Sequence, residues 1–215
     1  MTNYDLKTVL HWLWVRKEIV RLNYPFFTYR RLVGRCGIEK CMKLFEYARK
    51  SDRPIVEIGS FLGLSTIAIA SGSDQGFKQK IYAIDPHTKI KCADGINYPN
   101  TKRAFLDNLK KSNSSYLIES IFKFSQDAVK GWDKEIGFLF IDGDHGYKEV
   151  KRDFEQWTKF VGYMGIVAMD DVGVYEGVSK FFKEVRANPE FVWLEHSLNV
   201  DYFRKITDCE AGGRK

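Results

Sequence analysis

The chain has 215 residues, of which 44% are hydrophobic and 15% aromatic, so it is too apolar to be disordered and long enough for one well-buried domain. Its formal net charge of +6 would suit an anionic partner. The lysines are spread over the whole length, however, which favours a solvated surface over a nucleic-acid-binding face.

Two helices are predicted before the first strand. Apolar residues alternate with basic ones at helical spacing over residues 5–22, and a second helix is predicted over Ile38–Arg49. Between them lies the aromatic and basic segment Tyr24–Arg31 (YPFFTYRR), which could cap a substrate pocket, contact a second subunit or touch a membrane surface. A helix packed on the domain is the favoured interpretation. We therefore predict a helical extension over residues 1–50 and one main domain over residues 51–215.

From residue 54 onward, strands and helices alternate. The predicted strands are residues 55–58, Lys80–Ile84, Tyr116–Glu119, Ile136–Ile141, Gly165–Met169, Phe191–Leu194 and Tyr202–Lys205. The first predicted helix after these strands begin to alternate starts at Leu64. The other predicted helices are Thr101–Lys111, Ser125–Gly131, Tyr147–Val161 and Val174–Val185. No helix separates the last two strands. This order predicts an α/β fold with a doubly wound, mainly parallel sheet and an antiparallel edge.

The stretch VEIGSFLGLSTIAIA combines the end of a strand, a glycine-containing turn and the start of a helix. Its spacing, E-x-G-x-x-x-G-x-S from Glu57 through Gly59 and Gly63 to Ser65, differs from the G-x-G-x-x-G that receives a pyrophosphate. A carboxylate at the strand end suits a ligand with a cationic amino-acid end and no phosphate. S-adenosylmethionine (SAM) is the candidate that fits. The alternative is that the glycines serve packing alone.

Further polar residues follow the next two strands. Asp85 lies 22 residues beyond Gly63, at the distance where a carboxylate accepts both hydroxyl protons of a ribose. Ser125, Gln126 and Asp127 follow the third strand and could read an adenine edge. Alternatively, Ser125 caps a helix and the other two occupy its first turn.

Carboxylates also gather after two strands that should be neighbours. Asp142, Asp144 and His145 follow one strand (FLFIDGDHGY), and Asp170 and Asp171 follow the next (IVAMDDV). Two carboxylates about 4 Å apart repel by roughly 4 kcal/mol at an effective dielectric of about 20. An oxygen-rich site therefore predicts Mg²⁺, Mn²⁺ or Ca²⁺. The alternative is that Asp144 and Asp171 cap the helices that follow them, and that His145 is structural.

The remaining histidines and the cysteines carry no motif. His11, His87 and His196 are interpreted as structural residues. The cysteines lack C-x-x-C spacing, which argues against a zinc site or disulfides and predicts a reducing compartment; they are Cys36, Cys41, Cys92 and Cys209. No run of 18 apolar residues occurs and the first residues are unlike a signal peptide, so we expect a cytoplasmic protein without a membrane partner. A homo-oligomer stays open.

Together, the glycine turn, Asp85, IDGDHGYKEVKRDFEQW and MGIVAMDDV resemble the class I SAM-dependent methyltransferases. More narrowly, they resemble the branch of macrocin-type sugar O-methyltransferases and cephalosporin-hydroxylase-like proteins. The resemblance covers about residues 53–205 and implies a seven-stranded sheet. The segment Pro86–Pro99 matches no substrate loop of that branch.

The resemblance also implies roles for single residues. The SAM-binding residues would be Glu57, Gly59, Ser60, Gly63, Ser65, Asp85, Ser125, Gln126, Asp127 and Asp142. The metal ligands would be Asp142, Asp170 and Asp171. His145 would be the general base, acting beside Asp142.

These observations predict a SAM-dependent and Mg²⁺-dependent O-methyltransferase. Its acceptor would be a hydroxyl of a small molecule, such as a sugar or another diol. Two alternatives stay open. One is a SAM-binding partner subunit without turnover, and the other is an RNA methyltransferase, which only the net charge suggests.

Overall fold

The structure, a computed structural model, describes residues 38–91, 95, 97–98, 100–110 and 112–208. The helix predicted over residues 5–22 and the segment Tyr24–Arg31 lie outside the described residues. The division of the chain after residue 50 therefore stays a prediction. None of the helices within the described ranges has both the length and the apolar character needed to cross a membrane.

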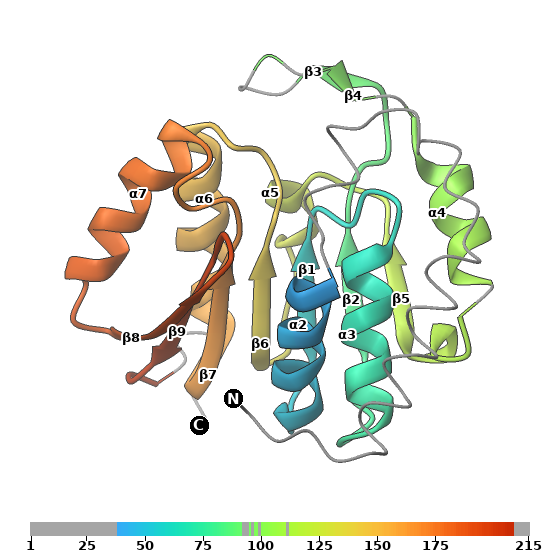
Figure 1. Ribbon diagram of the computed structural model, residues 1–215, viewed down its shortest axis with the longest axis horizontal. Helices are drawn as coiled ribbons and strands as arrows, with labels where there is room; N and C mark the ends of the chain where they lie inside the picture. Colours follow the sequence, from blue (N-terminus) through green and yellow to red (C-terminus); the bar gives the residue numbers. More distant parts are fainter. Residues whose placement is uncertain (1–37, 92–94, 96, 99, 111, 209–215) are drawn as a thin grey trace.

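One seven-stranded sheet forms the centre of the molecule, with the strand order β5-β2-β1-β6-β7-β9-β8 (Figure 1). Its first five strands run parallel, whereas β9 pairs antiparallel with both β7 and β8. The strands are β1 Ile55–Ile58, β2 Ile81–Ile84, β5 Ile118–Ile121, β6 Ile136–Ile141, β7 Val161–Met169, β8 Phe191–Ser197 and β9 Val200–Lys205. The predicted doubly wound α/β fold with an antiparallel edge is confirmed. A two-stranded sheet that was not predicted pairs β3 (Ile90–Lys91) with β4 (Asn97–Tyr98).

Helices cover both faces of the sheet. They are α2 Ile38–Lys50, α3 Leu64–Asp74, α4 Lys102–Leu109, α5 Ser125–Ala128, α6 Tyr147–Trp157 and α7 Glu176–Ala187, with short 3-10 turns at Ser115–Leu117 and Thr158–Phe160. Alternate residues of one strand pack on opposite layers. In β6, Phe138 and Phe140 pack in the cluster that contains residues of α2 and α3, whereas Leu139 and Ile141 pack with residues of α6 and α7. This two-sided burial explains the continuous apolar run in the sequence.

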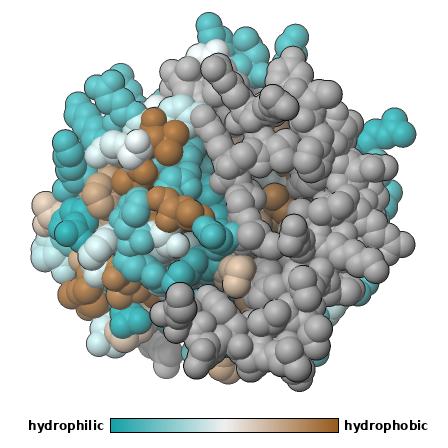
Figure 2. Space-filling model, in the orientation of Figure 1, coloured by the Kyte–Doolittle hydropathy of each residue, from teal (hydrophilic) through white to brown (hydrophobic). Residues whose placement is uncertain are grey.

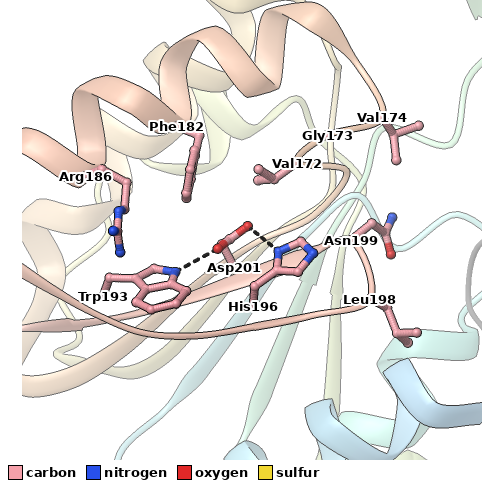
Figure 3. Close-up of a pocket in the computed structure, with 10 residues that line it drawn as sticks. All are labelled: Val172, Gly173, Val174, Phe182, Arg186, Trp193, His196, Leu198, Asn199 and Asp201. Carbon is pink, nitrogen blue, oxygen red and sulfur yellow. Dashed lines mark hydrogen bonds and ion pairs between the residues drawn. The ribbon is translucent and has the colours of Figure 1, made fainter.

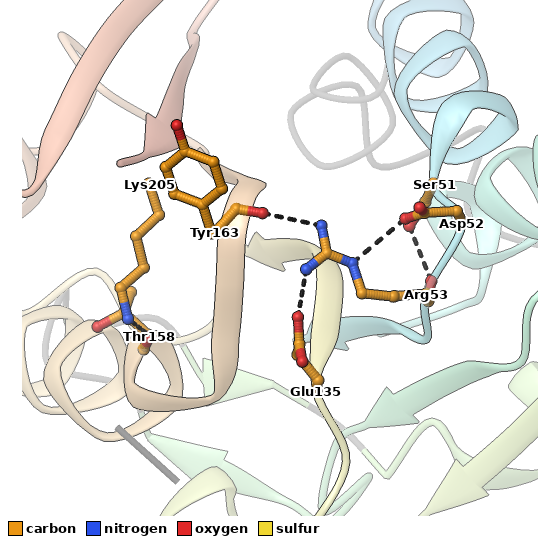
Figure 4. Close-up of polar contacts among 7 residues, drawn as sticks. All are labelled: Ser51, Asp52, Arg53, Glu135, Thr158, Tyr163 and Lys205. Carbon is orange, nitrogen blue, oxygen red and sulfur yellow. Dashed lines mark hydrogen bonds and ion pairs between the residues drawn. The ribbon is translucent and has the colours of Figure 1, made fainter. Parts of the chain in front are cut away.

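The amino end of the sheet is held by polar contacts around Arg53 (Figure 4). The Arg53 guanidinium pairs with Glu135, which precedes β6, and donates to the Tyr163 carbonyl in β7 at 3.0 Å. Nearby, the buried Lys205 ammonium in β9 donates to the Thr158 carbonyl at 2.8 Å. These contacts hold together the amino ends of β1, β6 and β7 and the carboxyl end of the antiparallel β9. The opposite edge, where the parallel strands end, is left for polar side chains.

At that opposite edge, the backbone continues the sheet for one residue beyond several strands. Asp142 N donates to the Ile58 carbonyl at 2.8 Å, and Asp170 N donates to the Ile141 carbonyl at 3.0 Å. Asp85 N donates to the carbonyl at the end of β5 at 3.2 Å. The first residue after β2, β6 and β7 is therefore an aspartate on a backbone fixed by the sheet, and the structure places all three along one rim.

Candidate active site

Glu57 is the fully buried acid near the end of β1. The Thr66 hydroxyl in α3 donates a hydrogen bond to Oε2. The Ser65 hydroxyl is near enough to lower the carboxyl pKa, yet Oε1 meets no donor at hydrogen-bonding geometry in the described part of the chain. Burial dominates and raises the Glu57 pKa to about 7. A buried carboxylate oxygen with no donor is costly, and a cationic group would stabilise it.

The turn after Glu57 needs both of its glycines for local reasons. Gly59 has φ +88°, and a Cβ there would lie 1.9 Å from the Asp142 carbonyl oxygen. Gly63 has φ +87°, and its Cβ would lie 3.1 Å from the Phe105 ring. Both positions therefore favour glycine through backbone conformation and close packing. This supports the packing alternative for the choice of residue and leaves a role in ligand binding open.

Asp85 ties the glycine turn to the loop after β2. Its Oδ2 accepts from Phe61 N at 2.8 Å and its Oδ1 accepts from His87 N at 2.7 Å. An ionised carboxylate can accept about four hydrogen bonds, so two remain for a ligand. His87 is buried between the hydroxyls of Thr101 (2.8 Å) and Ser60 (3.3 Å). Burial lowers the His87 pKa. Its contacts are those expected of a structural histidine.

Two neighbouring carboxyls lie at the ends of β6 and β7: Asp170 is buried and Asp142 is half-buried. Burial and the nearby Asp170 carboxyl raise the Asp142 pKa well above its usual range. Asp170 also accepts a hydrogen bond from the Lys40 ammonium of α2, and both side chains are 2% exposed. Lys40 lowers the pKa of both carboxyls, although burial still leaves each one raised. The positive charge at this rim therefore comes in part from a helix that precedes β1.

The neighbouring Asp171 points toward different partners. Its backbone has φ +61°, in the left-handed region that non-glycine residues seldom adopt. Its Oδ2 lies 3.0 Å from His145 Nε2, and its Oδ1 accepts from Asn199 Nδ2 at 2.6 Å. The His145 ring stacks on Tyr175, with centroids 4.0 Å apart and planes 5° apart. His145 is therefore held in one orientation on two sides.

Three of these groups could bind a cation together. Asp142, His145 and Asp171 each offer one ligand atom, and the three atoms lie within 4.8 Å of one another. The set predicted from the sequence contained Asp170 in place of His145. In the structure, Asp170 contacts Lys40 while His145 lies with the other two carboxylates.

The other predicted site residues lie around this rim. Asp144 Oδ1 accepts from Gly146 N at 3.0 Å in the turn before α6; the N-cap of that helix is Gly146, with no side-chain capping hydrogen bond, so Asp144 orders the turn and does not cap the helix. The Ser125 hydroxyl donates to the buried Asp153, whereas the Asp127 carboxylate pairs with Lys130 at 2.7 Å on the surface. Gln126 is half-buried at the start of α5.

Sequence reasoning missed Lys40 and Asn199. Lys40 is 130 residues from its partner and sits in an ordinary amphipathic helix. Asn199 belongs to the turn between β8 and β9, and only the pairing of β9 with β7 brings it to Asp171. Neither residue belongs to a motif, so a single sequence offered no signal for either.

A family model described as "Methyltransferase domain" matches residues 56–172, which include the glycine turn, Asp85 and the β6 and β7 rim. The chain belongs to this methyltransferase-domain family. The matched segment begins after α2, so Lys40 lies outside it.

Two curated relatives carry the description "uncharacterized protein". Protein y4gI of Sinorhizobium fredii is 27% identical over 157 residues, which are 70% of this chain and 16% of the relative. Protein R132 of Acanthamoeba polyphaga mimivirus is 30% identical over 143 residues, which are 64% of this chain and 58% of the relative. The chain thus spans only part of the length of these relatives, 16% of one and 58% of the other, and the description of neither relative states an activity.

Solved structures with this fold include three methyltransferases with a bound cofactor or product. The O-methyltransferase from Bacillus cereus in complex with SAH has a TM-score of 0.67 at 15% identity, covering 89% of this chain and 91% of that one. TomG from Streptomyces achromogenes, in complex with SAM, has a TM-score of 0.64 at 14% identity, covering 88% of this chain and 89% of that one. PaMTH1 from Podospora anserina, bound to SAH, has a TM-score of 0.62 at 19% identity, covering 96% of this chain and 90% of that one. The resemblance to the class I methyltransferases is thereby confirmed for the fold of this methyltransferase-family chain.

Proposed function

We propose that this protein is a SAM-dependent methyltransferase that methylates a hydroxyl oxygen of a small molecule. One observation carries the proposal: a member of the methyltransferase family places a fully buried carboxyl at the end of β1, with one oxygen lacking a donor among the described residues. A ligand with a cationic amino-acid end would supply the missing partner. The fold shared with SAM-bound and SAH-bound proteins supports the same ligand.

The proposed cofactor residues divide by chemistry. Glu57 would bind the ammonium end, and Asp85 would use its two remaining acceptor positions for a ribose. The turn residues Gly59, Ser60 and Gly63 with Ser65 would surround the amino-acid end, and Ser125, Gln126, Asp127 and Asp142 would complete the adenine and methyl sides. When bound, SAM supplies an activated methyl group on a sulfonium.

The chain's own contribution at the acceptor side is positioning and proton transfer. We propose that His145 takes the proton from the acceptor hydroxyl. Asp171, 3.0 Å from His145 Nε2, would stabilise the imidazolium that forms, and the stack on Tyr175 would keep the ring oriented. Asp142 would lie beside the reacting oxygen.

A divalent cation such as Mg²⁺ is part of the proposal, and the donors fit one. The carboxylates of Asp142 and Asp171 supply oxygen ligands. Either Asp170, released from Lys40, or His145 would complete the set. A bound cation would lower the pKa of the acceptor hydroxyl. A requirement for His145 as a ligand would exclude it as the base, so metal affinity of a His145→Ala variant separates the two roles.

We also propose a cytoplasmic protein with a small hydroxylated acceptor as its partner. Residues 1–50 would form a helical extension of the domain over residues 51–215. The packing of α2 with α3, in a cluster that includes Phe45 and Ala68, supports a close association of the extension with the domain.

Calorimetric titration with SAM tests the proposal. We expect binding to wild type with release of a proton near pH 6.5, because a cation beside Glu57 favours its ionised form. The proton appears as a binding enthalpy that depends on the ionisation enthalpy of the buffer. Glu57→Gln should lose the proton release, whereas the exposed control Glu119→Gln should keep it.

Asp85→Ala should weaken SAM by roughly 1.5–3 kcal/mol, the contribution of hydrogen bonds to a charged group. Binding of NAD in place of SAM would refute the proposed cofactor. SAM binding without transfer to any hydroxylated acceptor, with or without Mg²⁺, would instead identify a binding subunit.

A further inference from the structure

An open pocket of about 600 Å³ lies between α7, the β8–β9 hairpin and the loop after β7 (Figure 3). No residue predicted from the sequence to bind a ligand lines it. Its wall combines the aromatic rings of Phe182 and Trp193 with aliphatic side chains from the loop and the hairpin turn. Several of these side chains remain exposed: Val174 and Leu198 are each 50% exposed, and Trp193 is 40% exposed. Figure 2 shows hydrophobic patches interrupting the hydrophilic surface on the side of the molecule where Figure 1 places α7 and β8.

A buried carboxylate organises the polar part of this wall. Asp201 accepts from Trp193 Nε1 at 2.7 Å and from His196 Nδ1 at 2.8 Å, so each of its oxygens has a partner (Figure 3). The Asp201 side chain is 2% exposed, whereas that of His196 is 47% exposed. The contact with Asp201 orients the imidazole of His196 and leaves its Nε2 for a ligand. His196 was interpreted as structural; its partner is buried, but its ring is not.

The positive charge on this wall belongs to Arg186 of α7. Its guanidinium carbon lies 4.4 Å from the centre of the Trp193 ring. The described residues provide no acidic partner for it within ion-pair distance. Asp201, the nearest acid in the pocket wall, already accepts from two other donors. An unpaired guanidinium beside an exposed indole is suited to a planar ligand with a carboxylate, because the ring can pack on the aromatic wall while the guanidinium binds both oxygens.

The pocket adjoins the candidate active site and shares Asn199 with it. Asn199, in its wall, donates to Asp171, and Val172 N donates to the Asn199 carbonyl at 3.0 Å. His196 lies on β8, two strands beyond β7, and neighbouring strands are about 4.8 Å apart. His196 is therefore roughly 10 Å from the end of β7, too far to take a proton from an oxygen beside His145. A molecule that reaches both places must be longer than one ring.

We propose that this pocket binds the end of the acceptor remote from the methylated hydroxyl, and that this end is an aromatic ring bearing a carboxylate. The role of the pocket in binding the acceptor rests on the proposed methyltransferase function. The pocket itself, as a site for aromatic carboxylates, stands on the geometry of Arg186 and Trp193 alone.

The test uses a matched pair of probes in the absence of SAM: naphthoate, and naphthalenemethanol with the same substitution position. We expect calorimetry to show naphthoate binding to wild type, and about tenfold or greater weakening by Arg186→Gln, because a charge-assisted hydrogen bond is lost. Naphthalenemethanol should bind both proteins equally. Arg103→Gln, which changes an arginine that is 97% exposed on α4, is the matched control and should change neither affinity.

A second variant tests the proposal even if the Arg186→Gln variant does not fold. Leu198→Glu adds a negative charge at the half-exposed rim and should weaken naphthoate more than the alcohol. The proposal is overturned if wild type does not bind naphthoate at millimolar concentration. It is also overturned if Arg186→Gln binds naphthoate as tightly as Arg103→Gln does.

The role in acceptor binding has its own measurement. With SAM present, a hydroxynaphthoate should be methylated with a higher kcat/KM than the matching hydroxynaphthalenemethanol, and Arg186→Gln should remove the difference. Equal kcat/KM values in wild type would overturn the acceptor role. Failure of SAM to bind at all would refute the methyltransferase function while leaving the probe-binding result for the pocket unchanged.

Discussion

The pair between Lys40 and Asp170 allows a quantitative prediction about the site. Both side chains are 2% exposed, so Lys40→Met leaves the Asp170 carboxylate buried beside Asp142 without its cation. Removing one partner of a buried ion pair typically costs about 3–5 kcal/mol, because the remaining charge is desolvated and uncompensated. We expect Lys40→Met to lower the free energy of unfolding by that amount, a large share of the about 5–15 kcal/mol available to a domain.

The matched control is Lys43→Met in the same helix. Lys43 pairs with Glu195 at 2.8 Å, but the two side chains are 30% and 36% exposed. Solvent screens such a pair, so its loss should cost less than about 1 kcal/mol. Urea unfolding of both variants, followed by tryptophan fluorescence in the presence of a chelator, measures the difference. The chelator prevents a bound cation from replacing the lost ammonium.

Two outcomes would refute this reasoning. If Lys40→Met and Lys43→Met lost equal stability, the Lys40–Asp170 pair would not be a buried ion pair in solution. If Lys40→Met combined with Asp170→Leu were less stable than Lys40→Met alone, the cost would come from lost packing and not from an uncompensated charge. We expect the double variant to recover most of the loss.

Three further predictions concern other parts of the site. Burial raises the folded-state pKa of Glu57 from 4.5 to about 7, so the fold favours the protonated form and wild-type stability should fall by up to about 3 kcal/mol as pH rises from 4.5 to above 7. Glu57→Gln should lack this loss in pH-dependent thermal unfolding; equal slopes would contradict the assignment. His145→Ala should lose about 10²–10⁴ in kcat with unchanged SAM affinity, and a rate equal to wild type would exclude it as the base. Gly59→Ala should reduce expression or lower Tm sharply, because its Cβ would lie 1.9 Å from the Asp142 carbonyl oxygen; Tm within a few degrees of wild type would show that the strands can separate there.

The sequence predicted the regular elements where the apolar pattern has sharp ends. β6 was predicted with its observed bounds, because an apolar run is closed by Glu135 and Asp142. β5 was predicted two residues early, since Tyr116 and Leu117 form a 3-10 turn before it. The helix predicted to reach Val161 ends at Trp157, because β7 begins at Val161 and extends the sheet. The errors at the start of β5 and at the end of α6 both lie where tertiary pairing, and not the local pattern, decides the boundary.

The rim of the candidate site was predictable in outline for a topological reason. Adjacent parallel strands end at one edge, so aspartates that follow β6 and β7 must meet. The pairing of those aspartates was not predictable. Lys40, Asn199 and Asp201 acquire their roles from contacts between elements distant in the sheet order or in the chain. A single sequence holds no periodic signal for such contacts.

The left-handed backbone of Asp171 has a consequence for protein engineering. A residue at φ +61° is accommodated at lower cost by glycine or asparagine than by most others. Asparagine would also keep an oxygen for the Asn199 amide and remove one negative charge from a crowded rim. A search for stabilising substitutions should therefore select Asp171→Asn. Because the carboxylate faces His145, the same search would select against activity if His145 is the base that we propose, and a thermostable variant of this protein would then need Asp171 held fixed from the start.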